Sequence, residues 1–275
     1  REAHKRLKAL FTAYQDDTAP VGLPDPTGNL SVSNVTKFVP IRTPGIERPP
    51  ILEQVNFSLE PGDALGVIGP SASGKSTLAR ILVGAWRMDA GDVRLDGATL
   101  DQWQPEAIGR HIGYLPQHLE LLSGTIRDNI ARFDSEAPDE DVIEAAKMAG
   151  VHDMILHLPD GYGTQLGFGL QPLSGGQIQR LGLARAVFQK PKYVVLDEPN
   201  ANLDASGDEA LGKAIHALRD AGSTVIVMAH RPSAIAAVNK VLVLQGGRVA
   251  QFGNKADVLQ KAVRPTPTKN MIEAT

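Results

Sequence analysis

Continuous apolar runs separated by segments of helical periodicity are the main pattern around residue 66 and in the last third of the chain. Such runs are typical of parallel strands buried on both faces, because helices cover both sides of a parallel sheet. We expect strands at 64–68, 193–196, 224–229 and 241–244, and helices at 76–84, 207–220 and after Pro232. The pattern predicts an α/β fold with a mostly parallel sheet.

A second pattern lies nearer the start, where strand-like segments are separated by turns. Leu30–Phe38 alternates partly between apolar and polar residues, and Ile51–Leu59 follows a proline-rich turn. Asp92–Gly97 reads as a short strand that ends in an Asp-Gly turn. These segments predict an antiparallel β layer beside the parallel sheet. Near the end of the chain we expect a hairpin through 245–248 and a last helix at 254–262.

Between residues 138 and 190 the periodicity becomes helical. Apolar positions recur at helical spacing within 140–150, 151–158 and 176–189. We therefore expect a helical subdomain at about 118–190, inserted between two strands of the parallel sheet.

The two ends differ from residues 29–263, which we expect to form the main domain. In residues 1–14 the apolar side chains share one helical face: Ala3, Leu7, Leu10, Phe11 and Tyr14. That segment predicts the end of a helix entering from upstream, and 15–28, with its prolines and glycines, predicts a linker. The Pro/Thr-rich segment 264–275 predicts a disordered tail. The chain begins with Arg1 rather than Met, so we expect it to be a piece of a longer protein.

Composition narrows the functional classes. Of 275 residues, 42% are hydrophobic and 21% are charged, which is typical of a globular protein. The net charge of −3 argues against a general nucleic-acid-binding surface. Cysteine is absent, so disulfides and thiolate metal sites are excluded. No apolar run reaches the roughly 18 to 20 residues that a membrane-spanning helix needs, so another segment or chain would have to span any membrane at which the protein works.

The most specific motif follows the first buried strand. It consists of Gly69, Pro70, Ser71, Ala72, Ser73, Gly74, Lys75, Ser76 and Thr77. Two glycines separated by four residues and followed by Lys-Ser form a phosphate-loop pattern. Its backbone N–H groups would bind phosphate oxygens, Lys75 would reach the β- and γ-phosphates, and Ser76 would ligate Mg²⁺. The alternative is a Gly/Ser-rich turn with an exposed lysine, which the strand before the motif and the helix after it disfavour.

A pair of carboxylates ends the apolar strand at 193–196. Ligands of α/β sheets bind at the carboxyl ends of the strands, where Asp197 and Glu198 lie. Asp197 would hold Mg²⁺, and Glu198 would polarise or deprotonate an attacking water. Two acids in a solvated loop are the alternative, which the upstream phosphate loop disfavours.

A second helix start after Leu173 is rich in small residues: Ser174, Gly175, Gly176 and Gln177. Free N–H groups at such a helix start form an anion site. In isolation, the same residues could be a serine cap followed by flexible glycines. The anion site is favoured by the order of this segment, the Asp197 strand and Asn202-Leu203-Asp204.

This order of motifs resembles the nucleotide-binding domain of ATP-binding-cassette transporters, from about Leu30 to Leu259. The resemblance implies that residues 69–77 are the Walker A loop of a P-loop NTPase core, that Leu173–Gln177 is the signature and that Asp197 and Glu198 end the Walker B strand. It implies ATP and Mg²⁺ as cofactors.

Two further residues gain a role only through the resemblance. Gln117, in Tyr114-Leu-Pro-Gln, corresponds to the Q-loop glutamine and would be a Mg²⁺ ligand, and His230 corresponds to the switch histidine. On their own they would be an ordinary loop glutamine and an ordinary strand-end histidine. The implied catalytic set is Glu198, His230 and Lys75.

Some stretches are most similar to type I protein-secretion exporters, in which cassette and membrane domain share one polypeptide. They include residues 64–76, 111–117 and 243–253, and 122–130 is similar to exporters in general. The resemblance implies a homodimer that sandwiches two ATP molecules, each between one chain's phosphate loop and the other's signature. It further implies a position on the cytoplasmic face of the inner membrane, a membrane domain in the same chain, and a periplasmic adaptor and outer-membrane channel as partners.

Two positions depart from the family pattern. Phe168 stands where exporters usually have an acidic residue before the signature, and Val39 stands where an aromatic usually stacks on adenine. Phe38 is the nearest aromatic, but successive strand residues point to opposite faces unless a bulge intervenes. Membrane coupling and base recognition are therefore expected to differ from the pattern.

Two other functions compete with an exporter motor. A soluble cassette ATPase acting on ribosomes or DNA would tend to carry two cassettes, or a long coiled coil between Lys75 and Ser174, and neither is present in this sequence. A regulatory module without turnover would be expected to lose the catalytic acid first, and Glu198 is retained.

Overall fold

The computed structural model describes residues 2–13, 22–40, 48–167, 173–229 and 235–263. Within them the strands are β1 (Leu30–Phe38), β2 (Pro50–Leu59), β3 (Ala64–Ile68), β4 (Ala90–Leu95), β5 (Ala98–Thr99), β6 (Ile112–Leu115), β7 (Gly124–Thr125), β8 (Gln165–Leu166), β9 (Tyr193–Asp197), β10 (Thr224–Ala229), β11 (Lys240–Gln245) and β12 (Arg248–Asn254). The helices are α1 (Glu2–Ala13), α2 (Lys75–Leu82), α3 (Pro105–His111), α4 (Ile126–Ile130), α5 (Asp139–Met148), α6 (His152–Leu156), α7 (Gly175–Val187), α8 (Ala205–Asp220) and α9 (Lys255–Val263), with single 3₁₀ turns at Leu100–Gln102 and Gly161–Gly163.

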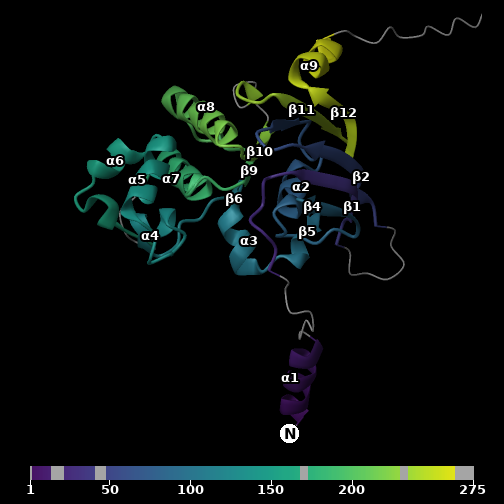
Figure 1. Ribbon diagram of the computed structural model, residues 1–275, viewed down its shortest axis with the longest axis horizontal. Coiled ribbons are helices and arrows are strands. Elements are labelled where there is room, and N and C mark those ends of the chain that lie inside the picture. The colour runs from purple at the N-terminus through teal and green to yellow at the C-terminus, as the bar shows by residue number, and fades with distance from the viewer. Residues whose placement is uncertain (1, 14–21, 41–47, 168–172, 230–234, 264–275) are drawn as a thin grey trace, which may run out of the picture.

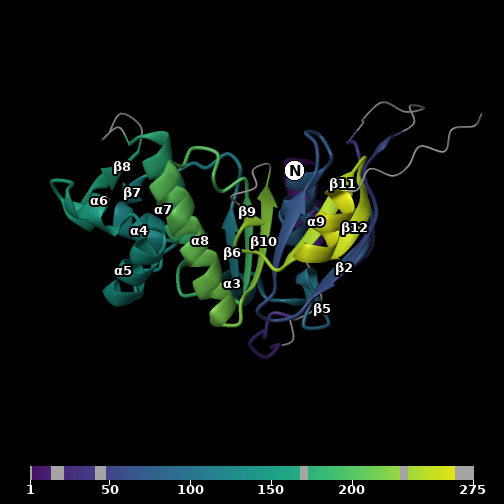
Figure 2. The same ribbon diagram turned by 90° about the horizontal axis from the view of Figure 1, so that it is seen from above.

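In the described part of the chain, a six-stranded sheet has the order β12-β11-β3-β10-β9-β6. The strands from β11 to β6 are parallel, and β12 pairs antiparallel at one edge. Alternate residues of each strand enter different hydrophobic clusters: Tyr193 and Val195 pack with α2, whereas Val194 and Leu196 pack with α7 and α8. Figure 2 shows α7 and α8 together on one side of this sheet. Burial of both faces explains the continuous apolar runs and confirms the predicted parallel sheet.

A second, antiparallel sheet has the order β2-β1-β4-β5. Helix α2 lies between the two sheets, where Leu78, Ile81 and Leu82 are fully buried in one cluster with residues of both. Figure 1 shows these strands and α2 grouped on the right. The predicted antiparallel layer is confirmed.

Helices α4 to α7 form a separate group, on the left of Figure 1. Their bounds differ from the predicted ones by one to two residues for α5, α6 and α7. Within this group, β7 and β8 form a two-stranded antiparallel sheet that the sequence did not predict.

Helix α8 begins at Ala205, two residues earlier than predicted, because the Asp204 carboxylate accepts the N–H of Gly207 at 2.8 Å and caps the helix.

Several predictions about the termini and loops have mixed outcomes. The first helix is confirmed as α1, and Figure 1 draws it clear of the two sheets. Strand β6 and helix α3 were not predicted. The helix expected after Pro232 would begin within 230–234, which lie outside the described residues, and the described residues 235–239 that follow form no α-helix, so that part of the prediction is wrong. The disordered tail predicted at 264–275 lies outside the described residues. None of the described helices is long and apolar enough to cross a membrane.

The segment leading into β1 is bonded to the turn between β4 and β5. Asp96 accepts the N–H of Thr27 at 2.7 Å, that of Gly28 at 3.1 Å and that of Asn29 at 3.2 Å. The carbonyl of Gly28 accepts the Thr224 hydroxyl at 2.5 Å. The end of the predicted linker is thus fixed to both sheets.

Candidate functional site

The loop of residues 69–77 joins β3 to α2, as the sequence predicts. A Cβ atom at position 69 would lie 2.1 Å from the carbonyl oxygen of Leu244 in β11. Gly74 has a φ of +99°, and a Cβ there would lie 2.7 Å from Leu52 Cδ2 in β2. Both glycines therefore let the loop approach neighbouring strands closely, and only Gly74 also needs glycine for its backbone conformation.

Lys75 lies inside this loop, with only 5% of its surface exposed. Its ammonium group donates to the carbonyl oxygens of Gly69 at 2.8 Å and Pro70 at 3.0 Å. Burial lowers the pKa of Lys75, and the carboxylates of Glu198 and Asp197 oppose that shift. Helix α2 begins at Lys75, and its N-cap Gly74 supplies no side-chain acceptor for the first-turn N–H groups. A buried cation and uncapped helix amides are the groups that favour a phosphate.

Three oxygen-bearing side chains meet beside the loop. The Ser76 hydroxyl lies 3.2 Å from Asp197 Oδ1 and 3.4 Å from Gln117 Oε1, and it can donate to either. The structure thus brings together the residues expected to hold Mg²⁺. Because Mg²⁺ prefers oxygen ligands and usually keeps several waters, one carboxylate with a hydroxyl and an amide is a fitting donor set. Within the described chain no group of three His, Cys, Asp or Glu residues is arranged to hold a metal.

Asp197 carries a buried carboxylate oxygen without a hydrogen-bond partner among the described residues. It is 1% exposed, and in the described structure its Oδ2 atom has no hydrogen-bond partner. Burial raises the pKa of Asp197, and the hydrogen bond from Ser76 acts in the opposite direction. A buried carboxylate oxygen without a partner is costly unless a cation or donor reaches it.

Glu198 follows at a sharp change of backbone direction. It has a φ of +52°, and its N–H donates to the carbonyl oxygen of Met228 at 3.0 Å, the residue beside Asp197 in β10. A non-glycine residue in this conformation is uncommon and is found disproportionately at functional sites. The turn separates the half-buried Glu198 side chain from the strand that holds Asp197.

The signature segment lies elsewhere in the chain. Ser174 caps α7: its hydroxyl accepts the N–H of Gln177 at 3.3 Å, and the Gln177 side chain accepts the N–H of Ser174 at 2.8 Å. Ser174 and Gly175 are exposed, and a Cβ at Gly176 would lie 3.0 Å from the carbonyl oxygen of Asn202. This segment thus packs against the loop after β9, whereas the phosphate loop packs against β2 and β11. Figure 1 places α7 in the helical group and α2 among the strands.

Two predicted residues have no described position. His230 and Phe168 lie outside the described residues. The predicted catalytic role of His230 and the consequence of Phe168 before the signature therefore stay predictions.

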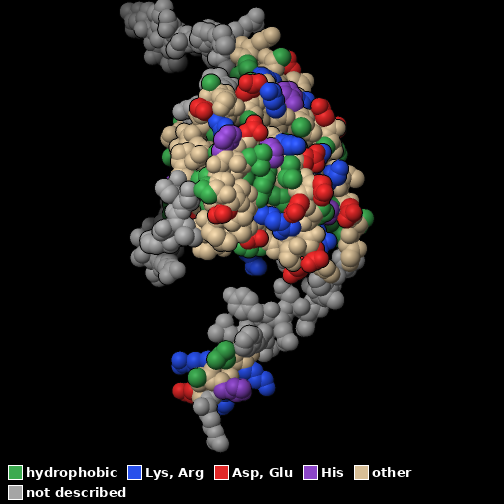
Figure 3. All heavy atoms as spheres, turned by 90° about the vertical axis from the view of Figure 1, so that its left-hand side faces the viewer, with side chains coloured by type: hydrophobic (Ala, Val, Ile, Leu, Met, Phe, Trp, Pro, Cys, Tyr) green, Lys and Arg blue, Asp and Glu red, His purple; other side chains and the backbone are tan. Residues whose placement is uncertain are grey.

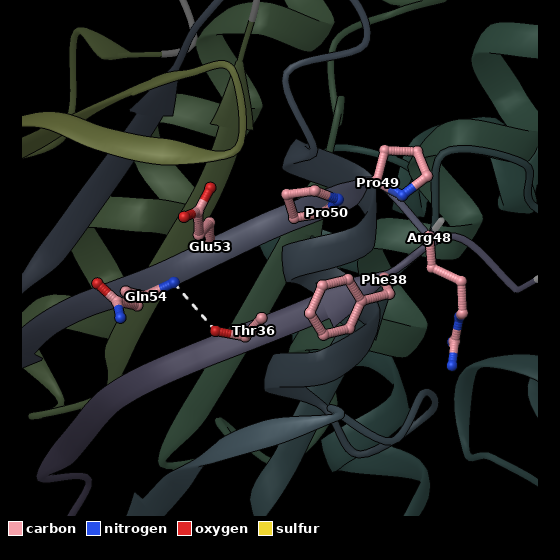
Figure 4. A pocket seen from close by; sticks show the side chains of 7 residues that line it. All are labelled: Thr36, Phe38, Arg48, Pro49, Pro50, Glu53 and Gln54. Carbon is pink, nitrogen blue, oxygen red and sulfur yellow. Dashed lines mark hydrogen bonds between the residues drawn. The ribbon is translucent and has the colours of Figure 1, made fainter. Parts of the chain in front are cut away.

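A pocket of about 670 Å³ lies at the end of the β1–β2 pair where Phe38 pairs with Pro50. Its lining residues are Thr36, Phe38, Arg48, Pro49, Pro50, Glu53 and Gln54, drawn in Figure 4. The guanidinium carbon of Arg48 lies 5.8 Å from the centre of the Phe38 ring. The β1–β2 pairing shifts register between Lys37 and Phe38, which pair with Leu52 and Pro50, so the extra residue lies in β2 and not between Phe38 and Val39.

Sequence reasoning missed Arg80 and Tyr114. Arg80 lies one helical turn after Ser76 and places its guanidinium carbon 4.8 Å from the centre of the Trp86 ring. Tyr114 pairs with Val195 in β6–β9, on the face that carries Asp197. Burial raises the pKa of Tyr114, Asp197 adds to that shift, and a hydrogen bond with Arg80 opposes it. The spacing from Ser76 could have indicated Arg80, but Tyr114 could not be placed while β6 was unrecognised.

Residues 52–201, more than half of the chain, match the model of the ABC transporter family. The chain therefore belongs to the ABC transporter family, as an ATP-binding domain of the ABC ATPase class.

The chain is also similar to individual proteins of that family. It is 50% identical to the type I secretion system ATP-binding protein PrsD of Rhizobium meliloti (strain 1021), over 96% of this chain and 45% of PrsD. It is 37% identical to an ATP-dependent lipid A-core flippase of Pseudomonas fluorescens (strain Pf0-1), over 94% of this chain and 42% of the flippase. The solved structure of a bacterial Atm1-family ABC exporter with ATP bound matches with a TM-score of 0.76 and 28% identity, over 95% of this chain and 46% of that one. The chain thus spans less than half the length of these relatives.

Proposed function

We propose that this chain is the ATP-hydrolysing motor of a type I secretion exporter and drives the export of a protein. The observation that carries the proposal is the convergence of Lys75, Ser76 and Asp197 in one buried site, within a chain 50% identical to the type I secretion protein PrsD. The match to an ATP-bound exporter structure also supports it.

The phosphates of ATP would bind at the loop of residues 69–77. The Lys75 ammonium already has two acceptors, the carbonyl oxygens of Gly69 and Pro70. Phosphate oxygens would replace or supplement them, and the first-turn N–H groups of α2 would donate to the same phosphates.

Mg²⁺ would be held by Ser76, Gln117 and Asp197, with Asp197 Oδ2 as the oxygen still lacking a partner. The ion would neutralise charge on the β- and γ-phosphates. Glu198 would accept a proton from the attacking water as general base, and we assign His230 to contacts with the γ-phosphate.

Assembly would complete the site. In the proposed homodimer, Ser174–Gln177 of one copy would lie against the ATP held by the phosphate loop of the other. The exposure of Ser174 and Gly175 in the single chain is compatible with such a contact.

We assign residues 29–263 to the cassette, with its helical subdomain at about 118–190. Residues 1–28 would connect it to a membrane domain of the same polypeptide, on the cytoplasmic face of the inner membrane. A periplasmic adaptor and an outer-membrane channel would be its partners, as in type I secretion.

A second candidate function is lipid export, because one relative is an ATP-dependent lipid A-core flippase at 37% identity. An action on nucleic acid has less support. On the face shown in Figure 3, acidic and basic side chains are interspersed and form no single basic patch.

Secretion in the native organism tests the proposal. A strain lacking the full-length protein should lose one or more proteins from its culture medium, and the wild-type gene should restore them. The Glu198→Gln form should not restore them, whereas Glu209→Gln, the same change at an exposed carboxylate of α8, should. An unchanged set of secreted proteins, with lipid A accumulating in the inner membrane, would favour lipid export instead.

A further inference from the structure

Arg180, on the first turns of α7, joins three elements through one guanidinium group. It forms an ion pair with Asp204, donates to the Ser206 hydroxyl at 2.8 Å and donates to the carbonyl oxygen of Gly150 at 3.2 Å. Gly150 follows α5, and Asp204 is the N-cap of α8. The start of the signature helix is therefore tied to the end of one helix and the beginning of another.

The same stretch of α7 also touches the loop between β9 and α8. The buried Gln179 side chain donates to the carbonyl oxygen of Pro199 at 3.1 Å. Gly176 lies so close to the carbonyl oxygen of Asn202 that a Cβ atom would approach it to 3.0 Å. Together with the pair between Arg180 and Asp204, these contacts run along the loop from residue 199 to 204. The signature segment and this loop cannot shift relative to each other without breaking them.

We infer that Arg180 is a positioning residue, which fixes Ser174–Gln177 relative to the 199–204 loop so that both meet a second copy of this chain in one arrangement. The inference rests on the proposed ATP-dependent dimer. Three donors of one rigid planar group reach three separate partners, a geometry that specifies position better than a flexible lysine could.

Exposure supports positioning rather than stabilisation. The Asp204 side chain is 68% exposed and that of Arg180 is 21% exposed, so water screens the carboxylate of the pair and reduces its contribution to stability. The chain offers a matched pair on α8, Lys213 with Glu209, whose side chains are 74% and 68% exposed. That pair lies within one helix and therefore fixes no element relative to another.

The test uses Glu198→Gln as the parent, because it should retain ATP and hold the dimer. Arg180→Gln, Arg180→Lys and Asp204→Asn would each be added to it, with Lys213→Gln as the control. Asp204→Asn removes the charge that faces Arg180 but keeps a good helix cap. Sedimentation would give the dimerisation constant with Mg-ATP, nucleotide titration of the monomer would give the ATP affinity, and thermal unfolding would check the fold.

We expect Arg180→Gln and Asp204→Asn each to weaken dimerisation by about tenfold or more, a change of about 1.4 kcal/mol. The double variant that combines Arg180→Gln with Asp204→Asn should weaken dimerisation no further, because both substitutions break the same ion pair. Arg180→Lys should recover part of the loss, while monomer ATP affinity stays within about twofold and unfolding temperature matches the Lys213→Gln control. Dimerisation of Arg180→Gln and Arg180→Lys equal to that of the parent would overturn the inference, as would a loss matched by equal losses of ATP affinity and stability. A parent that stays monomeric with ATP bound would instead refute the proposed dimer, and the inference with it.

Discussion

The phosphate loop and the signature segment are both helix starts suited to anions, yet the chain prepares them differently. At the phosphate loop, the helix is capped by Gly74, which offers no side chain, and Lys75 is buried with its ammonium group inside. At the signature, Ser174 and Gln177 already satisfy each other's N–H groups, and Ser174 is exposed. The first is organised for a ligand before the ligand arrives, whereas the second is complete in a monomer and must exchange existing bonds to bind anything.

The phosphate loop is preorganised, whereas the capping groups of the signature segment already bond to each other, so we expect the two sites to bind a ligand with different affinities. A ligand at the phosphate loop gains contacts with groups already held in place, so it loses little free energy in ordering them. A ligand at the signature must compete with the capping box. We therefore expect the phosphate loop to determine nucleotide affinity and the signature to act only when a second copy brings ATP to it.

The largest expected effect removes the preorganised cation. Lys75→Ala should abolish detectable nucleotide binding, because no other side chain described inside the loop offers a buried positive charge. Binding of a fluorescent ATP analogue would measure it, with Lys213→Ala as the matched control on exposed α8. An affinity within about tenfold of wild type would show that the loop amides alone hold the phosphates.

The next effect separates binding from turnover. Glu198→Gln should leave ATP binding intact and reduce hydrolysis by at least roughly a hundredfold, since the amide cannot accept a proton from water. Phosphate release under saturating Mg-ATP is the measurement, and Glu209→Gln is the control. Equal turnover in both variants would remove Glu198 from the role of general base.

A smaller effect should come from the signature side. Ser174→Ala breaks the capping box and should reduce hydrolysis by about tenfold while leaving the ATP affinity of the monomer unchanged. Thr125→Ala breaks the capping box of α4 in the same way, so both should lose about 1 kcal/mol of stability. If Thr125→Ala lowered hydrolysis equally, the effect would be one of helix stability and the contrast between the two helix starts would fail.

Asp197, whose Oδ2 atom has no hydrogen-bond partner in the described structure, gives an effect on stability of opposite sign. Because burial raises the pKa of Asp197, folding loses stability as pH rises through the unfolded-state pKa of about 3.8 toward the higher folded-state pKa, and the loss persists at neutral pH. Asp197→Asn should therefore raise the unfolding temperature of the ligand-free chain at pH 7, by about 2–4 °C per kcal/mol recovered.

Scanning calorimetry with and without Mg-ATP would check this prediction. Added Mg-ATP should reverse the order, because wild type gains more ligand stabilisation than Asp197→Asn. The advantage of Asp197→Asn should shrink as pH falls toward 4. If Asp197→Asn were less stable than wild type at pH 7 without ligand, burial of the Asp197 carboxylate would not destabilise the ligand-free fold.

The smallest expected effect concerns recognition of the adenine base of ATP. Phe38→Ala should weaken ATP binding by less than about tenfold, because an aromatic contact contributes on the order of 0.5–1.5 kcal/mol, and GTP should be hydrolysed nearly as well as ATP. Arg48 already lies over the Phe38 ring and would have to move for a base to stack on that face. Dissociation constants for ATP and GTP, with the exposed Phe133→Ala as control, would measure it. A strong ATP preference that disappears in Phe38→Ala would show that Phe38 holds adenine.

The sequence predicted the elements whose signal is local. Strands β3 and β10 match their predicted bounds, because burial on both faces leaves an uninterrupted apolar run. Strand β6 was missed because it is short and contains Gly113, whose role is tertiary: a Cβ there would lie 2.0 Å from the carbonyl oxygen of Ala186 in α7. Strands β7 and β8 pair residues about 40 positions apart, and neither has a pattern of its own.

In the candidate site too, features encoded by a local motif or by the predicted sheet topology could be predicted, and features that depend on other distant contacts could not. The phosphate loop is one continuous motif, so its position between β3 and α2 followed from the residues themselves. The contact of Ser76 with Asp197, 121 positions away, required the parallel topology, which was also predicted. The contacts of Arg180 with Gly150 and Ser206 depend on where α5 ends and α8 begins, and no local pattern encodes that.

The attachment of Thr27, Gly28 and Asn29 to Asp96 has a mechanical consequence. A force arriving along the chain from α1 would first load these hydrogen bonds, which hold three successive N–H groups to a single carboxylate. The bond between Thr224 and Gly28 would carry part of the same load into the central sheet. Tension would then enter the cassette at the edge opposite its phosphate loop, because Asp96 follows β4 and Thr224 begins β10 at strand ends that lie away from Lys75.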